Sequence, residues 1–302
     1  MPNMDDKIKV YGFRRNRDLY LMMLPFLILF FVFVVLPVFA SMVISFTDFN
    51  LLQFPRFVGF SNYRRLFLND DIFITAVKNT FVIAVITGPI GYLLAFLMAW
   101  LINELPARIR AVLTIIFYAP SISGNVYLIF TIIFSSDPYG YLNAKLLEWG
   151  IIDSPILWLQ DTQYMLPVVV LVSLWMSLGF GFLAFVAGLQ TIDKTQYEAG
   201  EIDGIRNRWQ ELWYITLPNM RPQLMFGAIM SITSALGVGD ITVALTGFPS
   251  PQYGAHTIAN HLMDYGSIRM EMGYASGIAV VLFGMMVLTN MLFQKFIKRV
   301  GT

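Results

Sequence analysis

The sequence lacks cysteine and is poor in charge. With no cysteine among its 302 residues, the chain forms no disulfide and offers no thiolate ligand to a metal ion. Only 13% of its residues are charged, whereas soluble domains carry about 25%. So little charge cannot cover a water-soluble surface of this size, and the 57% of residues that are hydrophobic gather into long runs. The composition therefore indicates a membrane protein.

Motifs for catalysis are also missing. The chain has no GxxxxGK[ST] phosphate loop, so we expect no ATP hydrolysis by this chain itself. No Ser/His/Asp set accompanies a nucleophile turn, which argues against a membrane enzyme. Its two histidines, His256 and His261, lie on a predicted outer loop without an HExxH pattern. We expect ordinary surface histidines there rather than a metal site.

Six apolar runs are long enough to cross a bilayer, which takes about 20 helical residues each. They predict an all-α polytopic membrane protein with six transmembrane helices and no second domain. A polar segment, 1–18, precedes a single transmembrane domain, 19–302. The predicted spans are approximately 19–46, 73–102, 111–134, 164–189, 224–246 and 272–296.

The distribution of Lys and Arg predicts the orientation of these spans. Fourteen of the 20 Lys and Arg residues lie in segments that share a side with the N-terminus, and five lie in the alternate loops. Positive charge is retained in the cytoplasm. Both termini are therefore expected in the cytoplasm, together with the polar interval 191–222 between the fourth and fifth spans.

Polar and helix-breaking residues interrupt some of the predicted spans. Gly88-Pro89-Ile90-Gly91 lies within the second, where a proline kink is the simpler interpretation and a hinge along a pathway the alternative. The segment 118–125 makes the third span unusually polar. Asp240, near the outer end of the fifth, is either a functional intramembrane acid or a cap at the interface. Otherwise the spans hold almost no ionisable residue, which disfavours a proton-coupled carrier.

The interval 191–222 is the longest polar stretch with a helical pattern. Ile202, Ile205, Trp209 and Leu212 recur at spacings of three, four and three, which predicts one apolar stripe on a helix between 197 and 213. Pro218 is expected to end that helix before the fifth span. The stripe suits either a helix lying on the membrane interface or a helix that docks in a groove of another protein.

A motif within this interval decides between the two. Glu198-Ala-Gly-Glu-Ile-Asp-Gly204, followed by Ile215-Thr-Leu-Pro218, resembles the EAA loop of permease subunits in bacterial ATP-binding-cassette importers. The sequence departs from that pattern in two ways. Gly200 replaces an alanine, and the ten residues between Gly204 and Ile215 are one more than usual. The extra residue changes the detailed docking surface that the resemblance implies.

Two further segments carry the same resemblance, which covers nearly the whole chain. Residues 57–67, FVGFSNYRRLF, are similar to the F-x-G-x-x-N-Y segment of carbohydrate permeases, and residues 272–283, MGYASGIAVVLF, to the segment that opens their last span. The short basic C-terminus resembles the larger permease of maltose-type systems. Residues 135–162 are too few for the large extracytoplasmic insertion of that subunit.

The resemblance implies a mechanism and a set of partners. Two six-span permeases, most simply a heterodimer, form the pathway in the bacterial cytoplasmic membrane. Two cytoplasmic ATPase subunits bind ATP and Mg²⁺, so this chain itself needs no cofactor, and an extracytoplasmic solute-binding protein delivers the sugar. No nucleic acid takes part. The implied ATPase-coupling residues are Glu198, Ala199, Gly200, Asp203, Gly204, Ile205, Trp209, Leu217 and Pro218.

The resemblance also implies residues along the substrate pathway, on the spans before and after the EAA loop. An aromatic face with nearby hydroxyls suits a sugar, while the alternative is ordinary packing between helices. The implied pathway residues are Ser173, Trp175, Ser177, Phe180, Ser231 and Ser234, with Tyr118 as a further candidate. A polyol or glycerol phosphate is an alternative substrate. A self-sufficient secondary transporter is the alternative class of function.

Overall fold

The computed structural model describes residues 17–297, and the elements within this range are all helical. The N-terminal residues 1–16 and the basic residues Lys298 and Arg299 lie outside the described part of the chain. Of the apolar helices in residues 17–297, four are long enough to span a membrane, or five if the bent pair α13 and α14 counts as one span. The chain is therefore an all-helical protein with at least four apolar spans.

The elements follow the predicted spans closely, although several spans are divided. The predicted first, second, fourth, fifth and sixth spans correspond to α1–α2, α4, α8–α9, α13–α14 and α16. The bounds are α1 Arg17–Phe30, η1 Phe31–Val35, α2 Leu36–Ile44, α3 Ser61–Leu68, α4 Asp71–Asn103, α5 Ala107–Ile122, α6 Leu128–Ile133, α7 Tyr141–Glu148, α8 Thr162–Met176, α9 Phe180–Thr191, α10 Lys194–Ile202, α11 Arg208–Glu211, η2 Leu212–Thr216, α12 Leu217–Asn219, α13 Arg221–Leu236, α14 Asp240–Thr246, η3 Pro251–Tyr253, α15 Ile258–Met263, η4 Asp264–Ile268 and α16 Met272–Ile297.

The predicted third span is interrupted. Helix α5 ends at Ile122, and the chain resumes as α6 only at Leu128. Ser121, Ser123 and Gly124 fall at or near this break, where short polar side chains compete with the backbone and glycine lowers helix propensity. Neither piece alone is 18 residues long, and the pair is not among the candidate spans found in residues 17–297.

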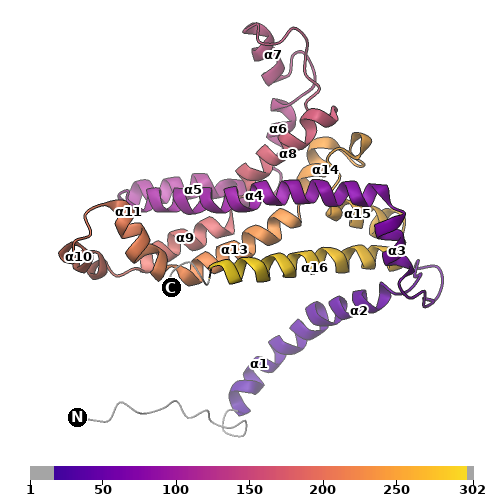
Figure 1. The fold of residues 1–302 in the computed structure, drawn as a ribbon, viewed down its shortest axis with the longest axis horizontal. Coiled ribbons are helices and arrows are strands. Elements are labelled where there is room, and N and C mark those ends of the chain that lie inside the picture. Colours follow the sequence, from indigo (N-terminus) through magenta and orange to yellow (C-terminus); the bar gives the residue numbers. More distant parts are fainter. Residues whose placement is uncertain (1–16, 298–302) are drawn as a thin grey trace.

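Helix α4 is the centre of the bundle. It packs against α8, α9 and α13, and α13 in turn packs against α9 and α16 (Figure 1). Three groups of buried side chains lie along it. One joins α4 to α9 around Phe96 and Phe185, another joins α4 to α16 around Phe73 and Ile278, and the third joins α4 to α8 around Ile83 and Val169.

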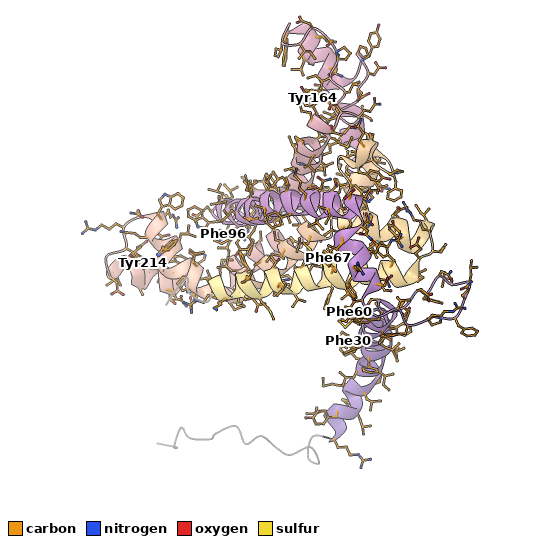
Figure 2. All side chains as sticks on the ribbon, turned by 45° about the vertical axis from the view of Figure 1, so that its right-hand side comes forward. Phe30, Phe60, Phe67, Phe96, Tyr164 and Tyr214 are labelled. Carbon is orange, nitrogen blue, oxygen red and sulfur yellow. The ribbon has the colours of Figure 1, made fainter. Side chains whose placement is uncertain are left out.

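The first span lies apart from this bundle. Helices α1 and α2 diverge from it toward the lower left of Figure 1, and no part of the apolar window in residues 19–44 is buried. Figure 2 shows the labelled Phe30 on this separate helix, whereas Phe96 lies within the bundle. Helix α2 packs against α16. The rest of the first span presents apolar side chains to its surroundings, as expected in a bilayer or against another subunit.

The segment after the first span is held by polar side chains of α3. The Asn62 amide donates hydrogen bonds to the carbonyl oxygens of Ser45 and Thr47, at 2.8 and 2.7 Å. The Tyr63 hydroxyl and the Ser45 hydroxyl lie 2.7 Å apart. These bonds satisfy backbone and side-chain groups where α2 ends. Asn62 and Tyr63 belong to the F-x-G-x-x-N-Y pattern, so this motif is structural at the loop that follows the first span.

The two histidines are buried, so the prediction of surface histidines is wrong. His256 is 2% exposed and His261 is 1% exposed. The ring nitrogens His256 Nε2 and His261 Nδ1 lie 3.3 Å apart, and His261 Nε2 lies 3.1 Å from Asp70 Oδ2. Tyr274 donates a hydrogen bond of 2.6 Å to the same carboxylate oxygen. Both rings are enclosed because α15 packs against α4 and α16 instead of lying on the surface.

A small lobe, residues 134–161, projects from the bundle beyond α6 and carries α7 (Figure 1). Asn143 is fully buried at its centre. Its amide nitrogen donates to the carbonyls of Ser135, Asp137 and Ile156. Its amide oxygen accepts from the Ile156 amide and the Trp158 indole. One side chain therefore joins three segments of the lobe by hydrogen bonds.

Candidate functional site

A cavity of about 340 Å³ lies in the bundle; most of its surface is apolar, and several side-chain hydroxyl groups line it. The short break between α8 and α9, residues 177–179, forms one wall, with α4, α5 and α13 around it. Non-helical backbone within a span is tolerated where it lines a cavity. Three of the predicted pathway residues meet here, namely Ser177, Ser231 and Ser234.

The hydroxyl groups that line this cavity donate their protons to backbone carbonyls. Ser177 donates to Leu174 at 2.6 Å, and Ser231 donates to Gly88 at 2.9 Å. Ser234 donates to the Ser231 carbonyl at 3.1 Å. Because each hydroxyl oxygen also has acceptor lone pairs, the cavity wall can accept hydrogen bonds from the hydroxyl groups of a polar solute.

Two further aliphatic hydroxyl groups in the lining belong to residues that were not among the predicted pathway residues. Ser121 of α5 donates to the carbonyl of Leu178 at 2.9 Å and so holds the α8–α9 break. Thr233 of α13 is the other. The breaker-rich stretch 118–125 contains Ser121 and was the available signal, whereas Thr233 follows no pattern in the sequence apart from its closeness to the two predicted serines.

The other predicted pathway residues lie elsewhere. Trp175 is 38% exposed, and its ring contacts Phe130 edge-on with 5.2 Å between centroids, outside the cavity. Ser173 is 5% exposed in the α4–α8 core, and its hydroxyl has no hydrogen-bond partner among the described residues. Tyr118 is half-buried on α5 and does not line the cavity. The Phe180 side chain lies outside the described part of the structure.

The 191–222 loop forms the end of the bundle that carries α10 and α11 (Figure 1). The single helix predicted between 197 and 213 is wrong, because the chain leaves helical geometry at residues 203–207. Asn207 then caps α11 by accepting from the Gln210 amide. The predicted stripe is split by this turn: Ile202 is 87% exposed and Trp209 is 68% exposed, whereas Leu212 is 6% exposed.

Two glycines of the motif serve different purposes. Gly204 has a φ of +94°, a conformation that costs an L-residue about 1 to 2 kcal/mol, and it makes the turn after α10. Gly200 is buried, and a Cβ there would meet the side chains of Ile215 and Ile205. The alanine usual at this position would not fit without displacement of Ile215. The departure from the family pattern at Gly200 is therefore matched by close packing.

The remaining motif residues are mostly on the surface. Glu198, Ala199 and Asp203 are exposed on or just after α10, and Glu198 makes no hydrogen bond or ion pair to the described residues. Ile205 and Leu217 are half-buried. Pro218 is exposed within α12 and does not end the helix at its own position. The helical run that begins at Arg208 continues one residue further, to Asn219, and ends there before α13, so the predicted break before the fifth span lies one residue after the proline.

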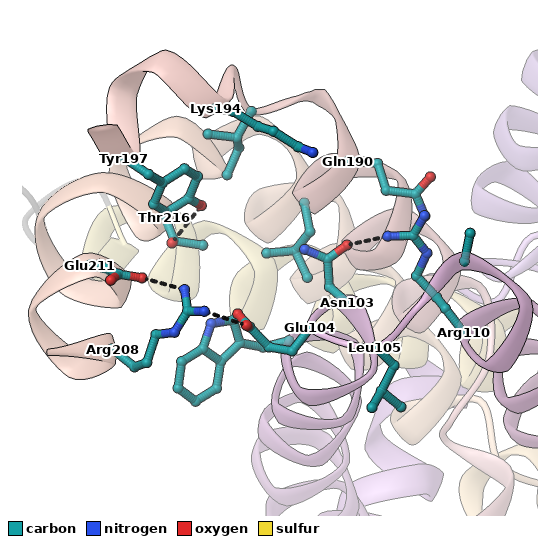
Figure 3. Close-up of a pocket in the computed structure, with 14 residues that line it drawn as sticks. Asn103, Glu104, Leu105, Arg110, Gln190, Lys194, Tyr197, Arg208, Glu211 and Thr216 are labelled. Carbon is teal, nitrogen blue, oxygen red and sulfur yellow. Dashed lines mark hydrogen bonds and ion pairs between the residues drawn. The ribbon is translucent and has the colours of Figure 1, made fainter. Parts of the chain in front are cut away.

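One ion pair attaches the loop to the end of α4, and a second lies within the loop (Figure 3). Arg208 contacts Glu104 at 2.8 Å and Glu211 at 2.7 Å. The hydroxyls of Tyr197 and Thr216 lie 3.0 Å apart. The indole rings of Trp100 and Trp209 contact each other at 5.5 Å between centroids, so a displacement of α11 would be transmitted to α4.

Asp240 is the first residue of α14 and is exposed. A carboxylate in the first turn of a helix interacts favourably with the helix dipole. Its position therefore agrees with the capping interpretation.

Comparisons with known proteins relate this arrangement to a family. Residues 88–302 match the model of the binding-protein-dependent transport system inner membrane component. The probable ABC transporter permease protein YesP of Bacillus subtilis is 32% identical over 280 residues, which is 91% of this chain and 89% of that protein. The lactose transport system permease protein LacF of Rhizobium radiobacter is 31% identical over 224 residues, 73% of each chain. The arabinooligosaccharides transport system permease protein AraP of Bacillus subtilis is 29% identical and covers 91% of this chain and 87% of its own.

Solved structures show the same fold. A chain of a bacterial ABC transporter involved in the import of the acidic polysaccharide alginate superposes with a TM-score of 0.75 at 23% identity, over 96% of this chain and 98% of its own. A chain of the bacterial alginate transporter in complex with a periplasmic protein bound to alginate pentasaccharide gives a TM-score of 0.73 at 25% identity, with the same coverage. The resemblance found in the EAA-type motif is thus confirmed over most of the chain, and the protein belongs to the family of binding-protein-dependent transport system inner membrane components.

Proposed function

We propose that this chain is a permease subunit of an ATP-binding-cassette importer for a sugar or oligosaccharide. The observation that carries the proposal is the pairing of two features in one bundle. A hydroxyl-lined cavity lies within it, and an exposed loop with the EAA-type motif lies at its end. Relatives named for lactose and arabinooligosaccharide transport support the carbohydrate class.

The proposed topology has six spans with both termini in the cytoplasm. Helices α5 and α6 together form the third span, interrupted at residues 123–127, and α13 with α14 forms the fifth, bent by 41°. This arrangement puts the 191–222 loop in the cytoplasm and the 134–161 lobe outside, in agreement with the distribution of Lys and Arg. The membrane is the bacterial cytoplasmic membrane.

The proposed partners are those that the family resemblance implies, and the exposed first span supports one of them. A second six-span permease, different from this chain, completes the pathway, and the exposed first span offers an apolar surface for it. Two cytoplasmic ATPase subunits bind ATP and Mg²⁺ and supply the energy. An extracytoplasmic solute-binding protein delivers the sugar; the alginate transporter relative was solved with such a periplasmic protein.

The 191–222 loop would pass ATPase motion to the pathway. Exposed Glu198, Asp203 and Trp209 form its outward surface, and the free Glu198 carboxylate suits a charge-assisted contact with a cationic side chain. The ion pair of Arg208 with Glu104 and the contact of Trp209 with Trp100 attach this surface to α4. Rigid-body motion of a docked loop would therefore tilt α4, which lines the cavity.

Copurification from membranes tests the coupling role. The double variant Glu198→Lys, Gly204→Asp is expected to lose the ATPase from the solubilised complex and to keep the second permease. Both changes lie at the exposed tip of the loop, so the bundle should stay folded. Glu148→Lys, an exposed reversal of charge in the lobe, is the matched control and should retain the ATPase.

The outcome separates two classes of transporter. Recovery of a P-loop ATPase with the wild type, and its loss from the double variant, supports the importer. If the chain purifies alone and moves a solute alone in liposomes, the chain is a secondary transporter and the coupling role is wrong. Retention of the ATPase by the double variant also contradicts the docking role of Glu198 and Gly204.

Uptake by cells tests the substrate pathway. Ser234→Leu places an apolar side chain in the cavity and removes an acceptor hydroxyl, so uptake should fall about tenfold or more while assembly persists. The sequence predicts that Trp175→Ala impairs uptake. Because Trp175 packs on Phe130 outside the cavity, the structure predicts a smaller effect than that of Ser234→Leu. A larger effect of Trp175→Ala than of Ser234→Leu would mean that Trp175 lines the substrate pathway.

A further inference from the structure

A second pocket, which is polar and has a volume of about 660 Å³, lies between the 191–222 loop and the ends of α4, α5 and α9 (Figure 3). It is distinct from the hydroxyl-lined cavity and shares no lining residue with it. Its volume falls within the range of small-molecule sites, about 300 to 1,000 Å³. The contacts of Arg208 and Tyr197 that hold the loop explain part of its polar lining, but they do not involve Arg110, Gln190 or Lys194.

Donor groups with one partner or none among the described residues gather on one side of this pocket. Lys194 makes no hydrogen bond or ion pair to the described residues, and neither does the Gln190 amide. Arg110 makes a single contact, a 3.3 Å hydrogen bond to Asn103, and no ion pair. Figure 3 shows the Lys194, Gln190 and Arg110 side chains extending to the same side of the pocket. A guanidinium, an ammonium and an amide with free N–H groups are the donors that bind a phosphate group.

The other side of the pocket carries acceptors. Glu104 and Glu211 face each other across Arg208, and their two carboxylates more than offset its one positive charge. Carboxylate oxygens accept hydrogen bonds from hydroxyl groups, and the indole of Trp100, which also lines the pocket, suits the apolar face of a sugar ring. A ligand that satisfies both sides has an anionic group at one end and hydroxyl groups at the other.

We infer that this pocket binds a phosphorylated monosaccharide, with its phosphate on Lys194 and Arg110 and its hydroxyls toward Glu104 and Glu211. A bound ligand would bridge α10 and α5 and so bear directly on the position of the 191–222 loop. The cytoplasmic location of the pocket rests on the proposed topology. Binding itself can be measured without transport or partners, so its failure would leave the proposed function standing.

Isothermal titration calorimetry on the purified full-length chain tests the inference. Glucose 6-phosphate is expected to bind saturably, and about tenfold or more tighter than either glucose or inorganic phosphate. Lys194→Gln and Arg110→Gln should each weaken that binding about tenfold or more, whereas Lys194→Arg should largely preserve it. Arg108→Gln is the matched control, because Arg108 lies on the same helix as Arg110 and does not line the pocket.

Nanodiscs with and without phosphatidylglycerol separate a soluble ligand from a lipid headgroup. Unchanged binding of glucose 6-phosphate in both supports the sugar phosphate. Competition by phosphatidylglycerol would overturn it in favour of a lipid site, and equal affinity for inorganic phosphate would reduce the pocket to an anion site. The absence of saturable binding, or equal weakening by Arg108→Gln, would also overturn the inference.

Discussion

At the scale of single residues, burial changes the chemistry of the histidine pair. Burial, and secondarily the neighbouring His261, lowers the pKa of His256 to about 4. Burial likewise lowers the pKa of His261, although Asp70 opposes this. Burial disfavours the charge of Asp70, but hydrogen bonds from Tyr274 and the Phe73 amide outweigh it and lower the pKa of that carboxyl. The pair is therefore held neutral beside an ionised carboxylate at neutral pH.

This arrangement predicts a loss of stability in acid. The unfolded chain protonates His256 near pH 6.5, whereas the folded protein resists protonation down to about pH 4. Above pH 6.5 His256 is neutral in both states, so it does not lower the free energy of unfolding. As the pH falls from 6.5 toward 4, only the unfolded chain binds the proton, and the free energy of unfolding decreases. At pH 5 the free energy of unfolding is lower by on the order of 2 kcal/mol. The thermal unfolding midpoint of the protein in detergent should therefore be lower at pH 5 than at pH 7.5.

His256→Gln gives the control for this prediction. The variant lacks the titrating group and is less stable at pH 7.5, but its midpoint should change less than that of the wild type between pH 7.5 and pH 5. Equal pH dependence in the two proteins would show that other groups cause the acid sensitivity.

At the scale of the elements, the 191–222 loop is assembled from short pieces rather than from one helix. Helix α10 is joined to α11 by a turn that requires a positive φ at Gly204. The extra residue in the interval between Gly204 and Ile215 lies within this turn or within the helices after it. The π-helical turn η2 comes directly after α11. Because a π-helical turn accommodates an additional residue within a helix, the longer interval need not displace Ile215, which stays buried against Gly200.

Gly204→Ala is predicted to loosen the loop while the bundle remains folded. A Cβ at Gly204 meets no neighbour, so the cost is the conformational strain of about 1 to 2 kcal/mol. Trypsin cleavage after the exposed Arg206 should therefore be about fivefold faster or more, because local opening becomes more favourable.

Gly150→Ala is a matched control for the strain itself. Gly150 also has a positive φ, of +66°, and a Cβ there meets no neighbour, but it lies in the 134–161 lobe. Cleavage after Arg206 should be unchanged in this variant. If both variants, or neither, accelerate cleavage at Arg206, the turn at Gly204 does not control the loop.

At the scale of the whole molecule, the arrangement of helices predicts which surfaces face each side of the membrane. The chain has no cysteine, so single cysteines can be introduced without a background. Leu52→Cys and Tyr139→Cys, at residues 90% and 92% exposed, should react with a membrane-impermeant maleimide added outside. Ile202→Cys, at a residue 87% exposed, should react only after the membrane is opened.

The labelling pattern distinguishes the proposed six spans from fewer. Residue 52 lies between the first span and α4, and residue 139 follows the α5–α6 pair. Because α4 crosses the membrane between them, residue 139 is on the same side as residue 52 only if the α5–α6 pair also crosses. Labelling of position 139 from the cytoplasmic side would mean that α5 and α6 do not form a span. Outside labelling of position 202 would invert the proposed orientation.

Local sequence was sufficient for much of the fold. The long apolar helices α4 and α16 follow directly from runs that match the thickness of a bilayer, since no other environment accepts them. The motif 198–204 with Pro218 identified the family, because its glycine and charged positions recur at short, local spacings. The third span was predicted as one run, 111–134, but its breaker-rich stretch 118–125 coincides with the interruption after α5, because helix propensity is a local property.

Tertiary structure decided what depends on distant partners. The sequence places His256 and His261 in a polar loop. They are buried because α15 packs against α4 and α16. Ser177, Ser231 and Ser234 share a cavity with Ser121, whereas Trp175 turns to Phe130, since each outcome depends on which helix lies opposite. Periodicity specifies one face of a helix, but the neighbour of that face is determined by packing across long stretches of chain.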